Sequence, residues 1–128
     1  MMDIDDFKHV NDTFGHECGD EVLIFVADFF SRNLRSSDMI FRWGGEEFIM
    51  ILKHTDASTA CAILEKLRQR LSETTIQTKV APVNETVTMG VAVLDKNEYE
   101  NGIKKCDDNL YIGKKGTKNV VVADSYTT

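Results

Sequence analysis

The chain has 128 residues, which is enough for one compact domain and too few for two. Hydrophobic residues make up 42% of the sequence and charged residues 28%, so a single core can be filled. A formal net charge of −6, with no basic stripe to offset it, argues against a nucleic-acid backbone as the main partner. A nucleotide can still bind, provided that magnesium carries the positive charge.

The three cysteines, Cys18, Cys61 and Cys106, are isolated and odd in number. Without a CxxC or Cys/His cluster they argue against structural zinc, and we predict that they fill the core in a reducing compartment. No signal peptide is evident, and no apolar run is long enough to span a bilayer. We therefore expect a cytoplasmic domain, although a longer parent protein could be tethered to a membrane.

Hydrophobic periodicity predicts short strands alternating with helices along one domain, residues 1–128. Strands are predicted at 1–5, 39–43, 48–52, 77–80, 86–94 and 120–122. Helices are predicted at 6–14, closed by Gly15, then from Gly19-Asp20 to 34, from 56 to 71 and from 98 to 112. The apolar positions expected to face inward are Ala60, Leu64, Leu67 and Leu71 in the helix from 56 to 71, and Ile103, Cys106 and Leu110 in the last. Hairpins and helical crossovers mix in this order, which predicts an α+β, ferredoxin-like fold with helices packed on a central sheet.

The stretch 42–48, Arg-Trp-Gly-Gly-Glu-Glu-Phe, predicts a tight hairpin turn at Gly44 and Gly45, because glycine takes the positive φ that such turns require. These glycines would also let a bulky ligand approach the backbone. Glu46 and Glu47 follow at once, although carboxylates are poor strand formers and gain nothing from burial. The hairpin explains the glycines but not the paired acids, so we interpret Glu46 and Glu47 as candidate ligands of a divalent cation.

A second acidic pair, Asp3 and Asp5, ends another predicted strand. Residues two apart on a strand point to one face, so the two carboxylates would lie together. Acidic groups from two separate segments are what a metal site for phosphate chemistry needs. The backbone from Ile4 to Lys8 lies beside a predicted helix N-terminus, which favours phosphate, and Lys8 adds a cation. The alternative for the aspartates is a solvated acidic turn.

Polar residues recur after this turn, at Asn11, His16 and Gly19-Asp20. A carboxylate accepts hydrogen bonds from N1–H and N2–H of guanine, and an amide both donates and accepts, whereas adenine offers no such donor pair. Asn11 and Asp20 are therefore candidate readers of guanine. Ordinary helix capping is the alternative for both, and His16 is interpreted as a turn residue.

Two further charged segments are open to more than one interpretation. Arg35 and Asp38, spaced RxxD before the hairpin, are typical of a surface ion pair, which contributes little to stability. The loop 114–119, Lys-Lys-Gly-Thr-Lys-Asn, could meet a triphosphate. It could equally be a solvated helix C-terminus, where cations suit the macrodipole.

Taken together, these motifs resemble those of the GGDEF family of diguanylate cyclases. Gly44-Gly45-Glu46-Glu47-Phe48 matches the motif that names the family, in the Glu-for-Asp form that active members also use. Residues 3–20 match its DxDxFKxxND…GHxxGD signature throughout, residues 86–92 look like its VTxSxGVA strand, and residues 107–119 resemble its final ADxALYxAKxxGRN helix and loop. The resemblance spans nearly the whole chain and implies a nucleotidyl-cyclase-like form of the predicted sheet.

The resemblance implies a role for each matching residue. Asp3 and Glu46, with the backbone carbonyl of Ile4, would hold Mg²⁺ or Mn²⁺, and Glu47 would support the metal site and the attacking hydroxyl. The residues implied to contact GTP are Asn11 and Asp20 at guanine, Phe7, Lys8, Lys114 and Lys118 at the phosphates, and Gly44 and Gly45 where the nucleotide lies against the hairpin. Arg35 and Asp38 match the family's RxxD product-inhibition site, which reverses the interpretation from chemistry alone.

Three features depart from the family pattern. The opening helix with its DxLTGLxNRR segment and a full first strand are absent, which suggests an N-terminally truncated domain without one wall of the nucleotide pocket. Lys118 stands where the family usually has arginine, so the charge remains but the bidentate fork is lost, and Gly116-Thr117 replaces the usual Ser-Gly order. Asp6 takes a position that is often aromatic or histidine.

The implied reaction condenses two GTP into cyclic di-GMP and two pyrophosphates, with one GTP on each of two facing protomers. The implied partners are therefore GTP, cyclic di-GMP, a second copy of the chain and an upstream sensor domain of a bacterial signalling protein. The alternative is a weak or inactive module that binds GTP or cyclic di-GMP. The intact Asp3, Glu46 and Glu47 argue against that module, and the truncation argues for it. A cyclase that makes mixed or adenine dinucleotides is a third interpretation, which Asp20 weakens.

Overall fold

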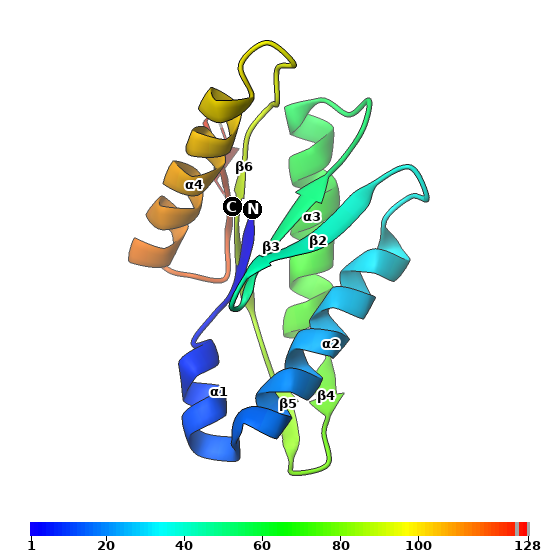
Figure 1. Ribbon diagram of the computed structural model, residues 1–128, viewed down its shortest axis with the longest axis vertical. Coiled ribbons are helices and arrows are strands. Elements are labelled where there is room, and N and C mark those ends of the chain that lie inside the picture. Colours follow the sequence, from blue (N-terminus) through cyan, green and yellow to red (C-terminus); the bar gives the residue numbers. More distant parts are fainter. Residues whose placement is uncertain (125, 128) are drawn as a thin grey trace.

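The computed structural model describes residues 1–124 and 126–127, and it forms a mixed sheet with helices on both faces (Figure 1). The strands are β1 (Met2–Ile4), β2 (Met39–Gly44), β3 (Glu47–Ile51), β4 (Thr75–Gln77), β5 (Pro82–Asn84), β6 (Val87–Val91), β7 (Val121–Ala123) and β8 (Tyr126–Thr127). The helices are α1 (Phe7–Phe14), α2 (His16–Asn33), α3 (Ala57–Ser72) and α4 (Tyr99–Lys115). The predicted α+β class is confirmed.

The first strand of the chain lies inside the main sheet, whose order is β2-β3-β1-β6-β7-β8. β1 pairs antiparallel with both β3 and β6, while β6 pairs parallel with β7 through the crossover helix α4. β4 and β5 form a separate two-stranded hairpin. This order places Asp3 opposite Glu47 on one side and opposite Thr88 on the other.

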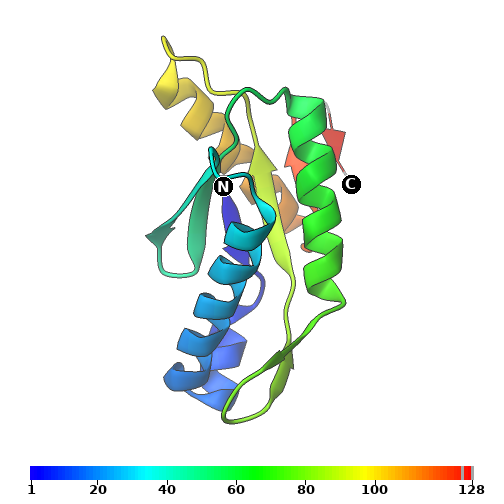
Figure 2. The same ribbon diagram turned by 90° about the vertical axis from the view of Figure 1, so that its right-hand side faces the viewer.

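The two faces of β1 have different surroundings because side chains alternate along a strand. Met2 and Ile4 are fully buried and belong to the main core, which includes Val26 and Leu64 from α2 and α3. Asp3 lies on the opposite face, the one that α4 covers. Figures 1 and 2 show α4 on one side of the sheet and α2 and α3 on the other. The acidic side chain of the first strand, Asp3, is thus directed away from the main core.

A close approach between α4 and β6 fixes the position of that helix. A Cβ on Gly90 would lie 2.1 Å from the carbonyl oxygen of Cys106 and 2.4 Å from the nitrogen of Leu110. Only glycine allows helix backbone and strand backbone to meet at this distance. As a result, the C-terminal end of α4, which carries Lys114, is held against the sheet beside β1.

Several predicted boundaries are wrong. α2 begins at His16 rather than at Gly19-Asp20, because Gly15 caps it directly after α1. The strand predicted at 77–80 is Thr75–Gln77, and β5 (Pro82–Asn84) and β8 (Tyr126–Thr127) were not predicted. Ile103, expected to point inward, is 40% exposed. The core prediction is right for Cys18 and Cys61, which are buried, whereas Cys106 is only partly buried.

The helices of residues 1–124 and 126–127 include none that is both long enough and apolar enough to cross a lipid bilayer.

Candidate active site at the junction of the first strand and the hairpin

The hairpin turn holds the first of the two glutamates. The turn residues are Gly45 and Glu46, not the predicted pair Gly44 and Gly45, since β2 continues through Gly44. Gly45 has a φ of 37°, and the register shifts between Arg42 and Gly44. The Ile4 N–H donates to the carbonyl oxygen of Glu46 at 3.2 Å, so the turn is fastened to β1. Glu46 and Glu47 therefore lie beside the end of the first strand.

Lys114 connects the end of α4 with Asp3 in β1 and with Asp5 directly after it. Its Nζ lies 3.1 Å from Oδ1 of Asp3 and 2.8 Å from Oδ1 of Asp5. The prediction that Asp3 and Asp5 share one face is therefore confirmed. Lys114 is only 22% exposed at its side chain, which excludes a freely solvated helix C-terminus for this residue.

Asp5 is the more deeply buried of the two aspartates, with 3% of its side chain exposed. Its Oδ1 accepts from Thr88 Oγ1 at 2.6 Å and from Lys114, and its Oδ2 accepts from Thr86 Oγ1 at 2.7 Å and from the Asn119 N–H at 3.0 Å. A carboxylate has about four acceptor positions, so protein donors fill all of them. Burial by itself would raise the pKa of Asp5, but these hydrogen bonds, led by the one from Lys114, hold it below its usual value.

At Asp3, in contrast, burial outweighs the groups that lower the pKa. Burial raises the pKa of Asp3 to about 6; the ammonium of Lys114 opposes the rise, and the negative charges of Glu46 and Glu47 add to it. Three carboxylates, those of Asp3, Glu46 and Glu47, thus lie near one another at the end of β1, and Lys114 pairs with the first of them. An excess of negative charge on oxygen donors fits a hard divalent cation such as Mg²⁺.

Side chains alone do not form a complete metal cage. The described residues contain no group of three or more His, Cys, Asp or Glu side chains arranged to hold an ion. The implied ligand set does not require one, because it combines Asp3 and Glu46 with the carbonyl of Ile4. Mg²⁺ usually keeps several waters and takes only one or two carboxylates. The residues present therefore fit the implied ion.

The α1–α2 hairpin brings Asn11 and Gly19 into contact, one residue before Asp20. A Cβ on Gly19 would lie 1.9 Å from Oδ1 of Asn11, so the amide rests directly on the backbone of α2. Capping does not explain these polar residues, because Asn11 and Asp20 lie within helices and the N-caps are Asp6 and Gly15. Phe7 is buried and Lys8 is exposed at the first turn of α1.

The loop after α4 is linked to the β1–α1 turn by a second ion pair. Lys118 Nζ lies 2.7 Å from Oδ1 of Asp6, and Lys118 and Asn119 have φ values of 55° and 47°. The structure therefore joins two residues that each depart from the family pattern. Sequence reasoning missed this pair, and it also missed the hydrogen bonds of Asp5 with Thr86 and Thr88. No local spacing could have indicated contacts between residues more than 80 positions apart.

The sequence matches the family described as diguanylate cyclase, GGDEF domain, over residues 1–120. The chain belongs to the GGDEF family. It is 38% identical over 123 residues to diguanylate cyclase A of Treponema denticola, which covers 94% of this chain and 33% of that protein. It is 39% identical over 124 residues to diguanylate cyclase DgcM of Escherichia coli K12, covering 96% of this chain and 30% of that protein. The chain thus spans about a third of the length of these curated relatives.

Solved GGDEF domains have the same fold. The GGDEF domain of DgcB from Caulobacter crescentus, in complex with c-di-GMP, has a TM-score of 0.88 at 34% identity and covers 95% of this chain and 74% of that chain. The active GGEEF domain of a diguanylate cyclase from Vibrio cholerae has a TM-score of 0.86 at 33% identity and covers 98% of this chain and 80% of that chain. The prediction that this GGDEF chain has a cyclase-like α+β fold is therefore confirmed.

The RxxD pair of this GGDEF chain is more than a loose surface contact. Arg35 donates from Nε and Nη2 to both carboxylate oxygens of Asp38, at 3.1 and 2.9 Å. Its Nη2 also donates to the Lys53 carbonyl at 2.6 Å and to Thr55 Oγ1 at 2.8 Å. The Asp38 carboxylate is 3% exposed, and the hydrogen bond from Arg35 lowers its pKa. A cavity of about 230 Å³ lies beside the pair, lined also by His54.

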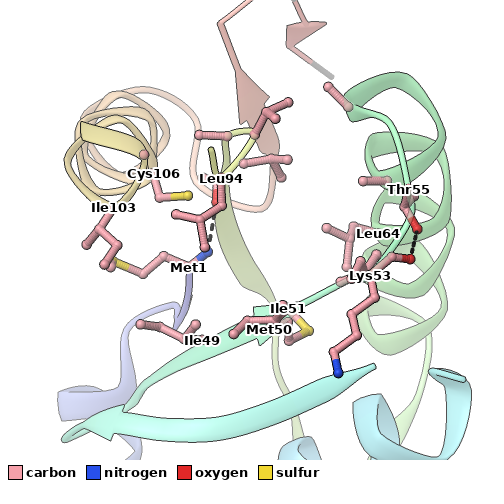
Figure 3. Close-up of a pocket in the computed structure, with 18 of the residues that line it drawn as sticks. Met1, Ile49, Met50, Ile51, Lys53, Thr55, Leu64, Leu94, Ile103 and Cys106 are labelled. Atoms are coloured by element: carbon pink, nitrogen blue, oxygen red, sulfur yellow. Dashed lines mark hydrogen bonds between the residues drawn. The ribbon is translucent and has the colours of Figure 1, made fainter. Parts of the chain in front are cut away.

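A cavity of about 750 Å³, with a mainly apolar lining, lies apart from the acidic cluster. Figure 3 shows Met1, residues of β3, Leu94 and Ile103 around it. The terminal ammonium of Met1 donates to the Gly90 carbonyl at 2.8 Å, and burial lowers the pKa of that ammonium. Asp3, Glu46 and Lys114 do not line this space. The cavity is therefore distinct from the candidate metal site.

Proposed function

We propose that this GGDEF chain condenses two molecules of GTP into cyclic di-GMP and two pyrophosphates, as the cytoplasmic output domain of a bacterial signalling protein. The observation that carries the proposal is the acidic cluster where β1 meets the hairpin turn. There Asp3 lies close to Glu46 and Glu47, and burial, with the charges of these glutamates, raises its pKa although Lys114 pairs with it. The curated relatives, which are named diguanylate cyclases, support the same activity.

Asp3, Glu46 and the Ile4 carbonyl would hold Mg²⁺ or Mn²⁺ in this proposal. A bound divalent cation would offset the charge of the triphosphate and stabilise the charge that develops on the transferred group. Asp5 is left out of this set because protein donors already occupy its oxygens. Glu47, opposite Asp3 in the β1–β3 ladder, would support the site and orient the attacking hydroxyl.

The remaining groups bind and orient the nucleotide. The backbone amides of Phe7 and Lys8 lie in the first turn of α1, where unpaired N–H groups favour phosphate. Lys114 and Lys118 supply positive charge from the other side. Gly44 and Gly45 have nothing within 4 Å of the place where a side chain would begin, so the hairpin leaves open space for a ligand.

Asn11 and Asp20 would select guanine. Asp20 is exposed at the surface of α2, and the Asn11 amide lies against Gly19, the residue before it. A carboxylate there can accept from N1–H and N2–H of guanine, which adenine cannot offer. We expect GTP to bind more tightly than ATP for this reason.

The product joins two nucleotides symmetrically, so two copies of the chain must face each other, each with one GTP. Each 3′-hydroxyl then attacks the α-phosphate on the opposite chain, and positioning supplies most of the rate. The rest of a longer signalling protein, including a sensor domain, would bring two copies together. For separate chains, the rate should rise with the square of the concentration.

The test is production of cyclic di-GMP from GTP and Mg²⁺, measured by chromatography, for the chain alone and fused to a dimeric coiled coil. We expect product from the fusion, and a loss of at least about 100-fold for Glu46→Gln, which keeps size and removes charge. Glu73→Gln, at an exposed helix end, is the matched control and should keep full activity. GTP binding without any product at high concentration, in both forms, would support a nucleotide-binding module instead.

A further inference from the structure

The proposed reaction assigns no role to Asp5, although Asp5 is the most deeply buried of the charged side chains around Lys114. Burying a carboxylate is costly unless hydrogen bonds and an opposite charge compensate it. The compensation here is complete, and it comes from separate parts of the chain. The donors are Thr86 and Thr88 around the start of β6, Lys114 at the end of α4 and Asn119 in the loop that follows.

The two aspartates that contact Lys114 differ in how many of their acceptor positions remain free. All four acceptor positions of Asp5 are filled by protein donors. Asp3 receives Lys114 on one oxygen, and β1 places it beside the glutamates of the hairpin. If Asp3 turns toward a cation, Lys114 loses one of its two partners and keeps the other. Asp5 is therefore the contact that persists while the substrate binds.

Asp5 also fixes the loop that carries Lys118. The Asn119 N–H is shared between Asp5 Oδ2 and Thr88 Oγ1, each at 3.0 Å. Lys118 and Asn119 both have positive φ, a conformation that costs energy for residues other than glycine and persists only where surrounding contacts hold it. The position of the Lys118 ammonium therefore depends on the anchor provided one residue later.

We propose that Asp5 is a positioning residue that holds Lys114 and the loop 116–119 at the phosphate end of the site. This inference rests on the proposed function, because it assigns these cations to the triphosphate of GTP. Asp5 touches neither the nucleotide nor the metal ion and acts only through the lysines.

The variant Asp5→Asn tests the inference with little change in shape. An amide offers one acceptor oxygen in place of two, so either Lys114 or the Asn119 N–H loses its acceptor whichever way the amide turns. The hydroxyls of Thr86 and Thr88 can rotate and accept a hydrogen bond from the new NH₂ group, so their hydrogen bonds with residue 5 are less affected. We expect the Kd of GTP with Mg²⁺ to rise roughly tenfold. The Kd of GMP, which lacks the β- and γ-phosphates, should stay unchanged.

A double-variant cycle separates positioning from general loss of structure. Lys114→Met should weaken GTP binding by itself, and adding Asp5→Asn to it should cost much less than the same change does in the unaltered chain. Glu85→Gln is the matched control, because Glu85 is also buried and lies near Asp5 but makes no hydrogen bond with Lys114 or Asn119. We expect it to leave the Kd of GTP unchanged.

Amide hydrogen exchange by NMR gives a measurement that needs no nucleotide. In Asp5→Asn the Asn119 amide should exchange faster, while the Gly116 amide, which donates to Ile112 within the last turn of α4, should not. Unchanged GTP affinity in Asp5→Asn, or additive losses in the cycle, would overturn the inference alone. Absence of GTP binding by the unaltered chain would contradict the proposed function, and the inference with it.

Discussion

Two identical side chains, Asp3 and Asp5, differ in their chemistry because their surroundings differ. Asp5 has four protein donors, which compensate its burial and lower its pKa. Burial raises the pKa of Asp3 to about 6, while one lysine opposes the rise and two neighbouring glutamates add to it. A carboxylate with unfilled acceptor positions can take a cation, and one without them cannot. The site therefore separates a candidate metal ligand from an anchor two residues away.

Glu85 gives a prediction about stability at this scale. It is 7% exposed, and burial, with the charges of Asp5 and Asp6, raises its pKa from 4.5 to about 7. The folded state therefore binds a proton that the unfolded state releases between these two pH values. Stability contributed by the protonated form is lost as the pH rises through this window, and the loss is complete above it. The cost at high pH is at most about 3 kcal/mol, by the scale of 1.36 kcal/mol for each pKa unit.

We expect Glu85→Gln to be more stable than the unaltered chain at pH 8, by about 1 to 3 kcal/mol, with little difference at pH 4.5. Urea unfolding at both pH values measures the difference in the free energy of unfolding between the two proteins. Asp3 titrates in the same range, but it is present in both proteins and cancels in the comparison. A variant that is less stable than the unaltered chain at pH 8 would show that Glu85 is stabilised in its charged form.

At the scale of elements, local patterns predicted the parts of the site that lie within one segment. The spacing of Asp3 and Asp5 predicted a shared face, and the apolar positions of α3, from Ala60 to Leu71, are buried as expected. The family motifs indicated that the hairpin acids and the first strand belong to one site. These results follow from strand and helix periodicity, which a sequence displays directly.

The contacts that complete the site were not predictable in the same way. Lys114 meets Asp5 across 109 positions of sequence, and the meeting depends on how closely α4 approaches Gly90. The hairpin turn is displaced by one residue because a register shift precedes it, which the Gly-Gly pair does not reveal. Pro82 begins a strand in the small β4–β5 hairpin, where an edge position tolerates it.

The α1–α2 hairpin makes a prediction about base recognition. Gly19→Ala would place a methyl group 1.9 Å from Oδ1 of Asn11, so the amide must move away from α2. Alanine favours a helix over glycine by about 1 kcal/mol, and the displaced atom ends a flexible side chain, so stability should change little. We expect the Kd of GTP to rise roughly tenfold, and the preference for GTP over ATP to shrink.

Equilibrium binding of GTP and ATP, together with a thermal melt, measures both effects of Gly19→Ala. Ser31→Ala, an exposed position near the other end of the same helix, is the control and should alter neither. Unchanged GTP affinity in Gly19→Ala would show that the Asn11 amide takes no part in binding the base.

At the scale of the whole molecule, the two candidate nucleotide sites lie at opposite ends of α2. Asp20 is in its second turn, and Arg35 follows its last residue, Asn33, by two positions. The helix from Asp20 to Asn33, thirteen steps of 1.5 Å, therefore separates them by about 20 Å along its axis. Cyclic di-GMP at Arg35 and Asp38 would therefore not occupy the GTP site of the same chain. We therefore propose that inhibition acts by holding two chains apart, so that their bound nucleotides fail to meet.

Feedback through this second site is thus expected to lower turnover without weakening GTP binding. Arg35→Ala removes the bidentate contact with Asp38 and a charged residue that lines the adjoining cavity. We expect the half-inhibitory concentration of cyclic di-GMP to rise roughly tenfold or more, with KM for GTP unchanged. Arg35→Lys keeps the charge without the planar fork and should weaken inhibition by a similar factor.

Arg32→Ala, which removes an exposed arginine paired with Asp28, is the control and should leave inhibition unchanged. Inhibition that is the same in Arg35→Ala as in the unaltered chain would place the product elsewhere, and a parallel rise in KM would show that the product competes with GTP directly.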